Sequence, residues 1–309
     1  MKPISALIAT YNHGDYVVRA IESVLAQTRP PDEVIVIDDG STDGTAELIR
    51  GRFGASVRYA WQKNRGPAAA RNAGLRLCCG DWVAFLDADD TWLPRKLEAQ
   101  EAALARHARA ALVACDCLRC QPDGTVIGSM PLPGIEDRRH MLAQLTWRCL
   151  FVFSSVMARR DALLAHGGFP EDLRGGEDHL AWSRIAASHD VVAVHEPLVR
   201  YTSLPTGLSS NPRLLLTDVI VARRRVREAI VGHRPWPLSW WDGLCIRYGA
   251  ARSHVSAAEI YRDRGELRQA GHTMLRATPY WPLWPRHAYP LLGSVARRGM
   301  RALVTSRVA

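Results

Sequence analysis

The chain has 309 residues, of which 47% are hydrophobic and 23% are charged. These proportions exclude a largely disordered chain and allow one large domain with a smaller appendage. The net charge of +9 is uneven, because residues 1–215 hold 24 basic and 25 acidic side chains whereas residues 216–309 hold 16 and 6. The last third of the chain is therefore expected to face an anionic partner or to present a solvated basic surface.

Strands and helices alternate through the first hundred residues. Apolar, β-branched runs predict strands at 4–9, 33–39, 57–62 and 82–88. Amphipathic spacing and cap residues predict helices at 15–27, 41–53, 66–78 and 94–107. This order predicts an α/β fold with a mostly parallel, Rossmann-like sheet and helices on both faces.

The regular alternation weakens after residue 110. A hairpin is expected at 111–128 around Asp123 and Gly124, followed by a strand and helix at 151–169, a helix at 176–188 and a strand at 190–201. We expect a domain boundary near 208–213, which divides a large α/β domain (1–212) from a basic, Trp-rich helical region (213–309). Further helices are predicted at 214–230, 250–277 and 289–304.

Cysteine usage and hydropathy indicate the compartment. The seven cysteines follow no regular framework, which is typical of reduced thiols in the cytosol. The first apolar run is too short for a signal peptide, and no stretch approaches the roughly 18 apolar residues of a membrane span. We expect a cytoplasmic protein whose contact with a membrane would be peripheral, at its inner face.

Polar side chains follow three of the four expected strands, at 10–12, 38–41 and 87–90. In an open parallel sheet, ligands bind in the crevice beyond the carboxyl ends of the strands, so these segments should converge on one pocket. The first strand lacks the G-x-G-x-x-G of dinucleotide sites, and the chain has no G-x-x-x-x-G-K-[ST] phosphate loop.

The stretch "FLDADDTW" ends an interior strand in three carboxylates, Asp87, Asp89 and Asp90. Strand alternation is expected to place Asp87 and Asp89 on the same side, where each would raise the pKa of the other unless a cation lies between them. Mg²⁺ or Mn²⁺ takes such oxygen ligands and completes its shell with phosphates. The alternative is that Asp90 or Thr91 caps a helix beginning near Pro94.

Six motifs in order give the chain a family resemblance over about residues 3–205. They are "ISALIATYNHGDYVVRAIESVLAQT", "DEVIVIDDGSTDGT", "NRGPAAARNAGL", "GDWVAFLDADDTW", "SSVMARRDALLAHGGF" and "GEDHLAW". Together they resemble the family 2 glycosyltransferases of the GT-A fold. The resemblance implies an inverting transferase that uses Mn²⁺ or Mg²⁺ and a nucleotide-diphosphate sugar, usually UDP-linked. It implies a saccharide or lipid-linked acceptor, in bacterial cell-surface polysaccharide or glycolipid synthesis.

The resemblance also assigns residues to the donor. Tyr11 would lie against the base with Thr10 beside it, and Asp39 would accept a hydrogen bond from the base. Arg71 would lie near the nucleotide or its phosphates. The alternatives are that Tyr11 is a packed strand-end aromatic, that Asp39 or Ser41 caps the next helix, and that Arg71 lies on a helix surface.

The remaining roles concern metal and chemistry. By the same resemblance, Asp87 would face the ribose, the diphosphate and the metal, and Asp89 would bind the metal. Asp178 would be the general base, with Glu177 as the other candidate; both could instead be first-turn acids favoured by the helix dipole. Many members carry a His where this chain has Thr202 or Ser203, so a third protein ligand is not expected from this position.

Three cysteines, Cys115, Cys117 and Cys120, could indicate a zinc or redox site, but no fourth ligand follows at a zinc-like spacing. Two rival functions remain. A sugar-nucleotide nucleotidyltransferase would need cations near the donor entrance, where Lys63 and Arg65 are available. A nucleic-acid-binding protein would explain the basic tail but not the acidic strand ends, so no nucleic acid is expected.

The basic region combines arginines and tryptophans, which suits a membrane interface. Its residues of these two types include Arg223, Arg224, Arg225, Arg227, Trp236, Trp240, Trp241, Trp281 and Trp284. One hypothesis is peripheral contact with an anionic membrane. The other is that the region packs on the catalytic core as a helical subdomain.

Overall fold

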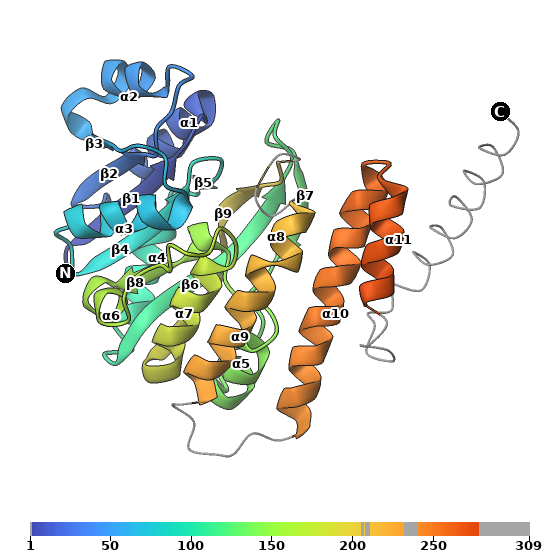
Figure 1. Ribbon diagram of the computed structural model, residues 1–309. Helices are drawn as coiled ribbons and strands as arrows, with labels where there is room; N and C mark the ends of the chain where they lie inside the picture. The colour runs from blue at the N-terminus through green and yellow to red at the C-terminus, as the bar shows by residue number, and fades with distance from the viewer. Residues whose placement is uncertain (1, 205–206, 208–210, 232–239, 278–309) are drawn as a thin grey trace, which may run out of the picture.

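The computed structural model describes residues 2–204, 207, 211–231 and 240–277. Within these residues, one sheet of nine strands forms the centre, in the order β3-β2-β1-β4-β8-β6-β9-β5 with β7 paired to β6 (Figure 1). The strands are β1 (Ile4–Thr10), β2 (Glu33–Asp38), β3 (Arg58–Trp61), β4 (Trp82–Asp87), β5 (Thr91–Trp92), β6 (Ala110–Cys120), β7 (Val126–Met130), β8 (Met157–Arg159) and β9 (Asp190–Thr202).

Helices connect and cover these strands. They are α1 (Gly14–Leu25), α2 (Thr45–Phe53), α3 (Pro67–Leu77), α4 (Lys96–Leu104), α5 (Arg138–Leu145), α6 (Arg160–Ala165), α7 (Glu177–Ser188), α8 (Pro212–Leu216), α9 (Asp218–Val231), α10 (Trp240–Asp263) and α11 (Leu267–Arg276). Two short 3-10 helices, η1 (Gly54–Ser56) and η2 (Phe153–Ser155), precede β3 and β8.

The first half of the sheet is parallel, as predicted. Strand β1 pairs in parallel with β2 and β4, and β2 pairs in parallel with β3. The second half is mixed, because β8 runs antiparallel to β4 and β6 whereas β9 runs parallel to β6. The expected hairpin at 111–128 is present as β6 and β7.

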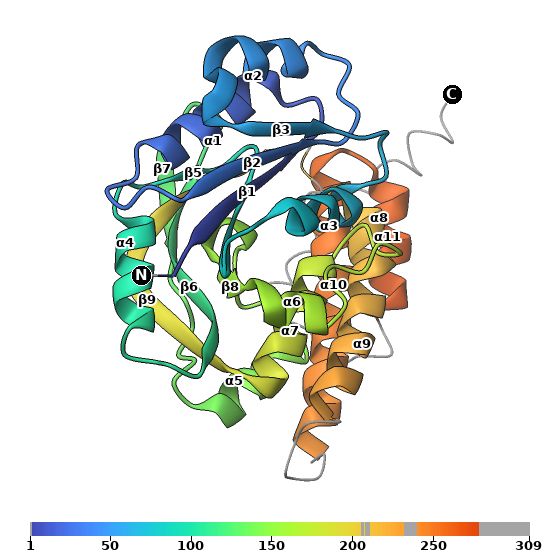
Figure 2. The same ribbon diagram turned by 90° about the vertical axis from the view of Figure 1, so that its left-hand side faces the viewer.

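Each face of the sheet carries its own core. On β1, Leu7 packs with buried residues of α3 and α7, whereas Ala6 and Ile8 pack with α1 and α4. Figure 2 shows α1 and α4 on one side of the sheet and α3, α6 and α7 on the other. The alternation of side chains along a strand therefore produces the two apolar layers that the sequence pattern predicts.

A close approach of α3 to the sheet depends on one glycine. A Cβ at Gly74 would lie 2.1 Å from Leu7 Cδ1 and 3.1 Å from Ile37 Cγ1. Any larger residue would push α3 away from β1 and β2. Because α3 also carries Arg71, this contact fixes the depth of a predicted site residue.

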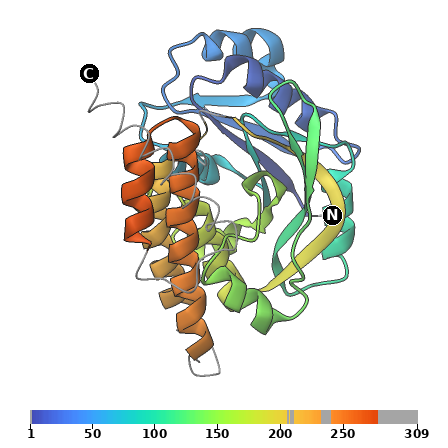
Figure 3. The ribbon, with the colours of Figure 1, turned by 90° about the vertical axis from the view of Figure 1, so that its right-hand side faces the viewer.

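The C-terminal helices pack against the α/β domain. Ala222, Val226 and Ile230 of α9 are buried in the same apolar cluster as Trp182 of α7. Helices α10 and α11 form a hairpin outside α8 and α9 (Figure 3). None of the described helices is long and apolar enough to cross a membrane. The predicted helix at 289–304 lies outside the described residues, and the predicted boundary at residue 212 falls at the start of α8.

One helix near the site was not predicted. Helix α5 begins after Asp137, whose Oδ1 accepts hydrogen bonds from the N–H groups of Arg139 (2.8 Å) and His140 (3.2 Å). This is the capping arrangement that an aspartate favours at a helix N-terminus. The cap was therefore visible in the sequence, but the short helix behind it lacks a clear apolar period.

Candidate active site

The loops after β1 and β2 are joined by hydrogen bonds. Asp39 N–H donates to Thr10 O (2.8 Å), Asn12 N–H donates to Ser41 Oγ (2.9 Å), and Thr42 N–H donates to Asn12 Oδ1 (2.8 Å). Asn12 has a φ of 53°, and no other non-glycine residue in the described part of the chain has a positive φ. These contacts hold the two strand ends together, as the sequence predicts.

Tyr11 and Thr10 present different surfaces at this edge. The Tyr11 side chain is 46% exposed, so the alternative of a packed strand-end aromatic is wrong. Thr10 is buried, and its Oγ1 has no hydrogen-bond partner among the described residues. An exposed aromatic ring beside an unsatisfied hydroxyl is an arrangement that a ligand could complete.

Asp39 organises the loop before α3. Its Oδ1 accepts from Gln62 Nε2 (2.7 Å) and Arg65 N–H (3.0 Å), and its Oδ2 accepts from Gly66 N–H (2.8 Å). A carboxylate has about four acceptor positions, so one remains for a ligand. The capping alternative for Asp39 and Ser41 is wrong, because α2 has Gly44 at its N-cap and its first N–H, that of Thr45, donates to Asp43 Oδ1 (3.2 Å).

Arg71 is buried rather than on a helix surface. Its side chain is only 8% exposed, and its guanidinium carbon lies 3.7 Å from the centre of the Phe153 ring. Nη2 donates to Asp87 Oδ1 at 2.9 Å, and Nη1 donates to Glu177 Oε1. Burial opposes the charge, but Asp87 and Glu177 outweigh it and raise the pKa of Arg71. This cation therefore connects the fourth strand end to the first turn of α7.

The carboxylates of Asp87, Asp89 and Asp90 gather within 4.8 Å of one another. The predicted proximity is confirmed, but its expected cause is wrong. Strand β4 ends at Asp87, and a turn closed by Asp90 N–H donating to Asp87 O (3.1 Å) brings Asp89 back. Burial and then the charge of Asp87 raise the pKa of Asp89 to about 7. Such repulsion is relieved by a bound cation.

Asp90 has a different role from its neighbours. It is 1% exposed, its Oδ2 accepts from Ser154 Oγ (2.5 Å), and its Oδ1 accepts from Thr202 N–H (2.8 Å). The same Ser154 Oγ accepts from Asp87 N–H (3.0 Å). The capping alternative is wrong, because α4 has Arg95 at its N-cap and the N–H of Leu97 in its first turn donates to Gln27 Oε1 (3.1 Å). The buried hydrogen bonds of Asp90 thus hold the acidic turn in place, and Asp87 and Asp89 are the carboxylates that remain to face a ligand.

Asp178 lies in the first turn of α7, directly after Glu177. Gly176 precedes them with a φ of 78°, and a Cβ there would lie 2.8 Å from Ala222 Cβ. Glycine is required by both the left-handed backbone and the contact with α9. Burial and then the charge of Glu177 raise the pKa of Asp178 to about 7, and Arg71 opposes this shift. That pKa suits a general base near neutral pH.

Some residues of the site were not predicted. Burial lowers the pKa of His13, although the charges of Asp87 and Asp43 act in the opposite direction. Desolvation and then the charge of Asp178 raise the pKa of the Cys149 thiol. Cys149 comes near Asp178 only through tertiary contacts, which nothing local in the sequence marks, whereas His13 directly follows the predicted strand-end segment 10–12.

The other predicted groups have ordinary surroundings. Cys115, Cys117 and Cys120 are buried in β6, and the acidic cluster is the one group in the described residues with metal-ligand spacing. The zinc alternative therefore has no geometric support. Arg65, a cation named for the nucleotidyltransferase alternative, pairs with Glu171 at 2.8 Å.

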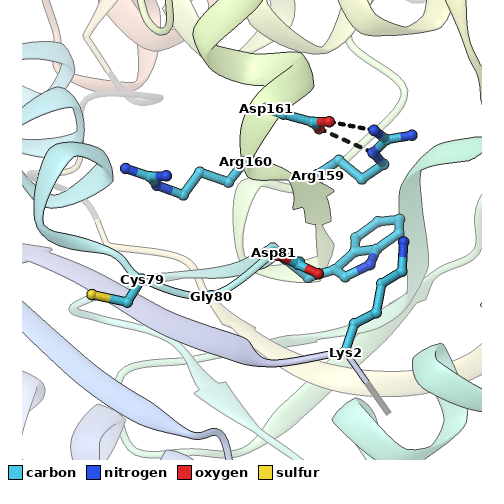
Figure 4. A pocket seen from close by; sticks show the side chains of 8 residues that line it. Lys2, Cys79, Gly80, Asp81, Arg159, Arg160 and Asp161 are labelled. Carbon is cyan, nitrogen blue, oxygen red and sulfur yellow. Dashed lines mark hydrogen bonds and ion pairs between the residues drawn. The ribbon is translucent and has the colours of Figure 1, made fainter.

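A pocket of about 200 Å³ lies at the opposite end of β4, by Gly80, Asp81 and Trp82 (Figure 4). Two of its charged side chains, Arg159 and Asp161, pair with each other. This hollow lies at the start of the strand, whereas the acidic cluster lies at its carboxyl end. It is therefore separate from the candidate active site.

The fold and the acidic cluster define a glycosyltransferase of the GT-A type, and comparisons with known proteins agree. Residues 5–166 match glycosyl transferase family 2, and the chain belongs to this family. An uncharacterized glycosyltransferase of Rickettsia felis is 32% identical over 196 residues, which is 63% of this chain and 32% of the relative. The UDP-Glc:alpha-D-GlcNAc-diphosphoundecaprenol beta-1,3-glucosyltransferase WfaP of Escherichia coli is 38% identical over 102 residues, or 32% of this chain and 40% of WfaP.

Solved structures share the fold. Residues 1–349 of S. aureus TarS in complex with UDP-GlcNAc superpose with a TM-score of 0.63 at 18% identity, covering 94% of this chain and 83% of TarS 1–349. The mannosyltransferase PcManGT from Pyrobaculum calidifontis, in complex with GDP-Man and Mn²⁺, gives a TM-score of 0.58 at 20% identity, with 97% and 81% covered. The GT-A expectation is confirmed. The chain spans less than half the length of the two curated relatives named above.

Proposed function

We propose that this protein is an inverting glycosyltransferase that moves a sugar from a UDP-linked donor to an acceptor hydroxyl. The observation that carries the proposal is one continuous chain of contacts. It runs from Asp89 and Asp87 through buried Arg71 to Glu177 and Asp178. A group that binds a diphosphate and a group that takes a proton are thereby held in one site.

The donor half lies at the ends of β1, β2 and β4. The exposed ring of Tyr11 offers a flat apolar face for a base. The free acceptor position of Asp39 suits an N–H on the edge of the base. Thr10 Oγ1, which is buried and unpaired, would gain a partner from the nucleoside. The complex of TarS with UDP-GlcNAc supports a uridine nucleotide.

Asp87 and Asp89 would hold Mn²⁺ or Mg²⁺. Their partly exposed oxygens are the ligands that these hard ions prefer, and the pKa of Asp89 is raised by burial and then by repulsion from Asp87, which the ion would remove. The bound ion supplies charge neutralisation to the leaving diphosphate. The Mn²⁺ complex of PcManGT supports this assignment. Arg71 would hold Asp87 in position, in addition to any contact that it makes with the nucleotide.

Asp178 would accept the proton of the acceptor hydroxyl as that oxygen attacks the anomeric carbon. One displacement from the far face inverts the stereocentre, which parallels the single-step logic of inverting glycoside hydrolysis. Glu177 accepts a hydrogen bond from Arg71 Nη1 and is only 5% exposed, which makes it the positioning residue of the pair. Asp178, which is partly exposed, is the group available to a substrate.

The acceptor is proposed to be a saccharide or a lipid-linked saccharide of a bacterial cell-surface polysaccharide or glycolipid. The printed substrate of WfaP, a sugar on diphosphoundecaprenol, supports this class. Such an acceptor would place the enzyme in the cytoplasm, at the inner face of the membrane. In α9, Arg225 pairs with Asp172 (2.5 Å) and Arg224 with Glu228 (3.3 Å), so part of the basic charge is neutralised within the protein.

Membrane contact by the region 213–309 is a separate proposal. Trp236, Trp281 and Trp284 lie outside the described residues. Flotation with phosphatidylglycerol vesicles, using the full chain and a chain ending at residue 277, measures it. Equal partitioning of the two chains would contradict membrane binding through residues 278–309.

Product analysis tests the proposed function. The purified enzyme is incubated with UDP-sugars, Mn²⁺ and candidate acceptors, and the nucleotide product is separated by chromatography. UDP as product supports sugar transfer, whereas release of pyrophosphate would indicate the rival nucleotidyltransferase. Proton NMR of the new glycosidic bond then tests inversion; retention of the donor's anomeric configuration would overturn it. Asp178→Asn should slow transfer roughly 10²- to 10⁴-fold, and Asp123→Asn, at an exposed hairpin carboxylate, is the matched control.

A further inference from the structure

A group of three arginines, Arg148, Arg223 and Arg252, lies beside the candidate base and takes no part in the donor site. Arg148 follows α5, Arg223 belongs to α9, and Arg252 belongs to α10. The charge of Arg252 lowers the pKa of both other guanidiniums, in addition to burial. The three side chains, called the arginine cluster below, therefore lie close enough to repel one another.

The packing of three helices creates this cluster. Arg223 Nη1 donates to Gly249 O and to Ser253 Oγ (2.6 Å), which joins α9 to α10. A Cβ at Gly249 would lie 2.9 Å from Trp147 O, so α10 is pressed against the segment that carries Arg148. The position of each arginine is thus set by backbone contacts.

The cluster adjoins the first turn of α7. Ala222, the neighbour of Arg223, lies against Gly176, directly before Glu177 and Asp178. The charges of both Asp178 and Arg223 act on the thiol of Cys149. Arg223 also lowers the pKa of buried His179. An acceptor whose hydroxyl reaches Asp178 would therefore extend toward the arginines.

The guanidiniums have unused donors. Arg148 Nε and Arg223 Nε are buried and have no hydrogen-bond partner among the described residues. Arg148 donates through Nη2 to Gln144 Oε1, and its guanidinium carbon lies 4.8 Å from the centre of the Trp147 ring. Each guanidinium carries five N–H donors, so most remain available. Buried N–H groups without partners are uncommon and call for a ligand.

No carboxylate neutralises the cluster. Among the described residues, no aspartate or glutamate forms an ion pair with any of the three arginines. The segments outside the described residues, 205–206, 208–210, 232–239 and 278–309, contain no Asp or Glu. Asp242 on α10 precedes Gly249 by seven residues, which is about 10 Å along a helix. The described side chains therefore supply no counter-ion to the cluster, and an anion from outside the chain could take that place.

We propose that the arginine cluster binds a phosphate or diphosphate group carried by the acceptor, next to the base Asp178. Guanidinium forks match phosphate oxygens and bind them in pairs of hydrogen bonds. The rings of Trp147 and Tyr248, whose centres lie 5.3 Å apart, add apolar surface beside the charge. This inference rests on the proposed function, because it names the chemistry of the acceptor.

Calorimetric titration of inorganic diphosphate measures the cluster directly. The titration is done with EDTA at low ionic strength, so that no metal ion takes part. The double variant Arg148→Gln/Arg252→Gln should weaken binding roughly tenfold or more, because each charged hydrogen bond contributes strongly. Arg224→Gln, an exposed arginine on the same helix as Arg223, is the matched control and should bind as the unchanged protein does. Equal weakening in both variants, or none in either, would overturn the proposal.

Two further arms identify the source of the phosphate. One compares a free monosaccharide acceptor with the same sugar carrying a short-chain alkyl diphosphate; KM should be lower for the second only when the arginine cluster is intact. The other measures binding to phosphatidylglycerol and phosphatidylcholine vesicles. Loss of vesicle binding in the double variant, without any change in KM for the diphosphate acceptor, would indicate a lipid headgroup site and contradict the proposal.

Metal-dependent hydrolysis of the donor distinguishes failure of the proposed function from failure of the proposed anion site. The double variant should retain this reaction, because its substitutions lie outside the donor site. If the unchanged protein neither binds nor hydrolyses any UDP-sugar but still binds diphosphate through the cluster, the proposed function fails and the anion site stands. If donor hydrolysis proceeds and diphosphate binding ignores the arginines, only the anion site fails.

Discussion

The acidic strand ends and the arginine cluster differ in how their charge is balanced. The acidic region holds Asp87, Asp89, Asp90 and Glu177, and it contains one buried cation, Arg71, which pairs with two of the four. The arginine cluster contains no acid at all among the described residues. The acidic region therefore contains an internal counter-ion and yet keeps some repulsion among its carboxylates, whereas the arginine cluster has no internal counter-ion among the described residues. Unbalanced charge of opposite sign on the two sides of Asp178 would orient a cation-bound donor and an anionic acceptor toward each other.

Removing the base should have the largest effect on activity. Asp178→Asn keeps the shape of the side chain but cannot accept a proton, so kcat should fall roughly 10²- to 10⁴-fold. Binding of UDP with Mn²⁺, measured by thermal shift, should not change. If Asp178→Asn lost donor binding as well as kcat, Asp178 would belong to the donor half of the site. The proposed separation of the two regions would then be wrong.

Removing the internal cation should destabilise the acidic region itself. Arg71→Met would leave Glu177 as an unpaired buried charge beside Asp87, at a cost of about 3–5 kcal/mol in the free energy of unfolding. The double variant Arg71→Met/Glu177→Gln should recover part of this loss in urea denaturation. If Arg71→Met had the same free energy of unfolding as the unchanged protein, the ion pair between Arg71 and Glu177 would not stabilise the acidic region.

The pH dependence of transfer should report the base. Asp178 faces Glu177 from its own helix, Arg71 from α3, Asp87 from β4 and Cys149 from the segment before η2. Because its pKa is raised to about 7, the carboxylate is charged and active above that pH and protonated below it. The rate should fall about tenfold for each further pH unit below 7. A rate that is level down to pH 5, with donor binding intact, would contradict the assignment.

The smallest expected effect concerns the serine that holds the acidic cluster together. Ser154→Ala removes the hydroxyl that donates to Asp90 and accepts from Asp87 N–H, which should cost about 1–3 kcal/mol in the free energy of unfolding. Ser23→Ala, which removes another hydroxyl bonded to the same loop at Trp92 N–H, serves as the comparison. Equal affinity for Mn²⁺ in both variants would show that Ser154 does not shape the metal site.

The sequence predicted what local patterns determine. The apolar runs of β1, β2 and β4 and the polar residues that follow them placed three site segments at one sheet edge, because parallel strands share that geometry. The hairpin after β6 followed from Asp123 and Gly124. These features require no knowledge of distant partners.

The partners of buried charges could not be predicted, because they are far apart in the chain. Arg71 and Glu177 are separated by 106 residues, and Asp90 and Thr202 by 112. The sequence allowed Asp90 to act locally as a helix cap, but in the structure it accepts hydrogen bonds from donors that are distant in the chain. The basic character of α9 was visible in the sequence, but the different roles of its arginines were not. Arg225 pairs with Asp172, whereas Arg223 is turned toward α10, and this difference depends on how the helices pack.

The most direct test of the account is the affinity of Mn²⁺ in the presence of UDP. The six-line electron paramagnetic resonance signal of free Mn²⁺ decreases as the ion binds, and it can be titrated for the unchanged protein, Asp89→Ala and the exposed control Asp123→Ala. We predict that UDP and Mn²⁺ tighten each other's binding in the unchanged protein and the control, and that Asp89→Ala weakens the ion about tenfold or more. Equal Mn²⁺ affinity in all three proteins would contradict the claim that the acidic strand ends hold a metal and a nucleotide diphosphate.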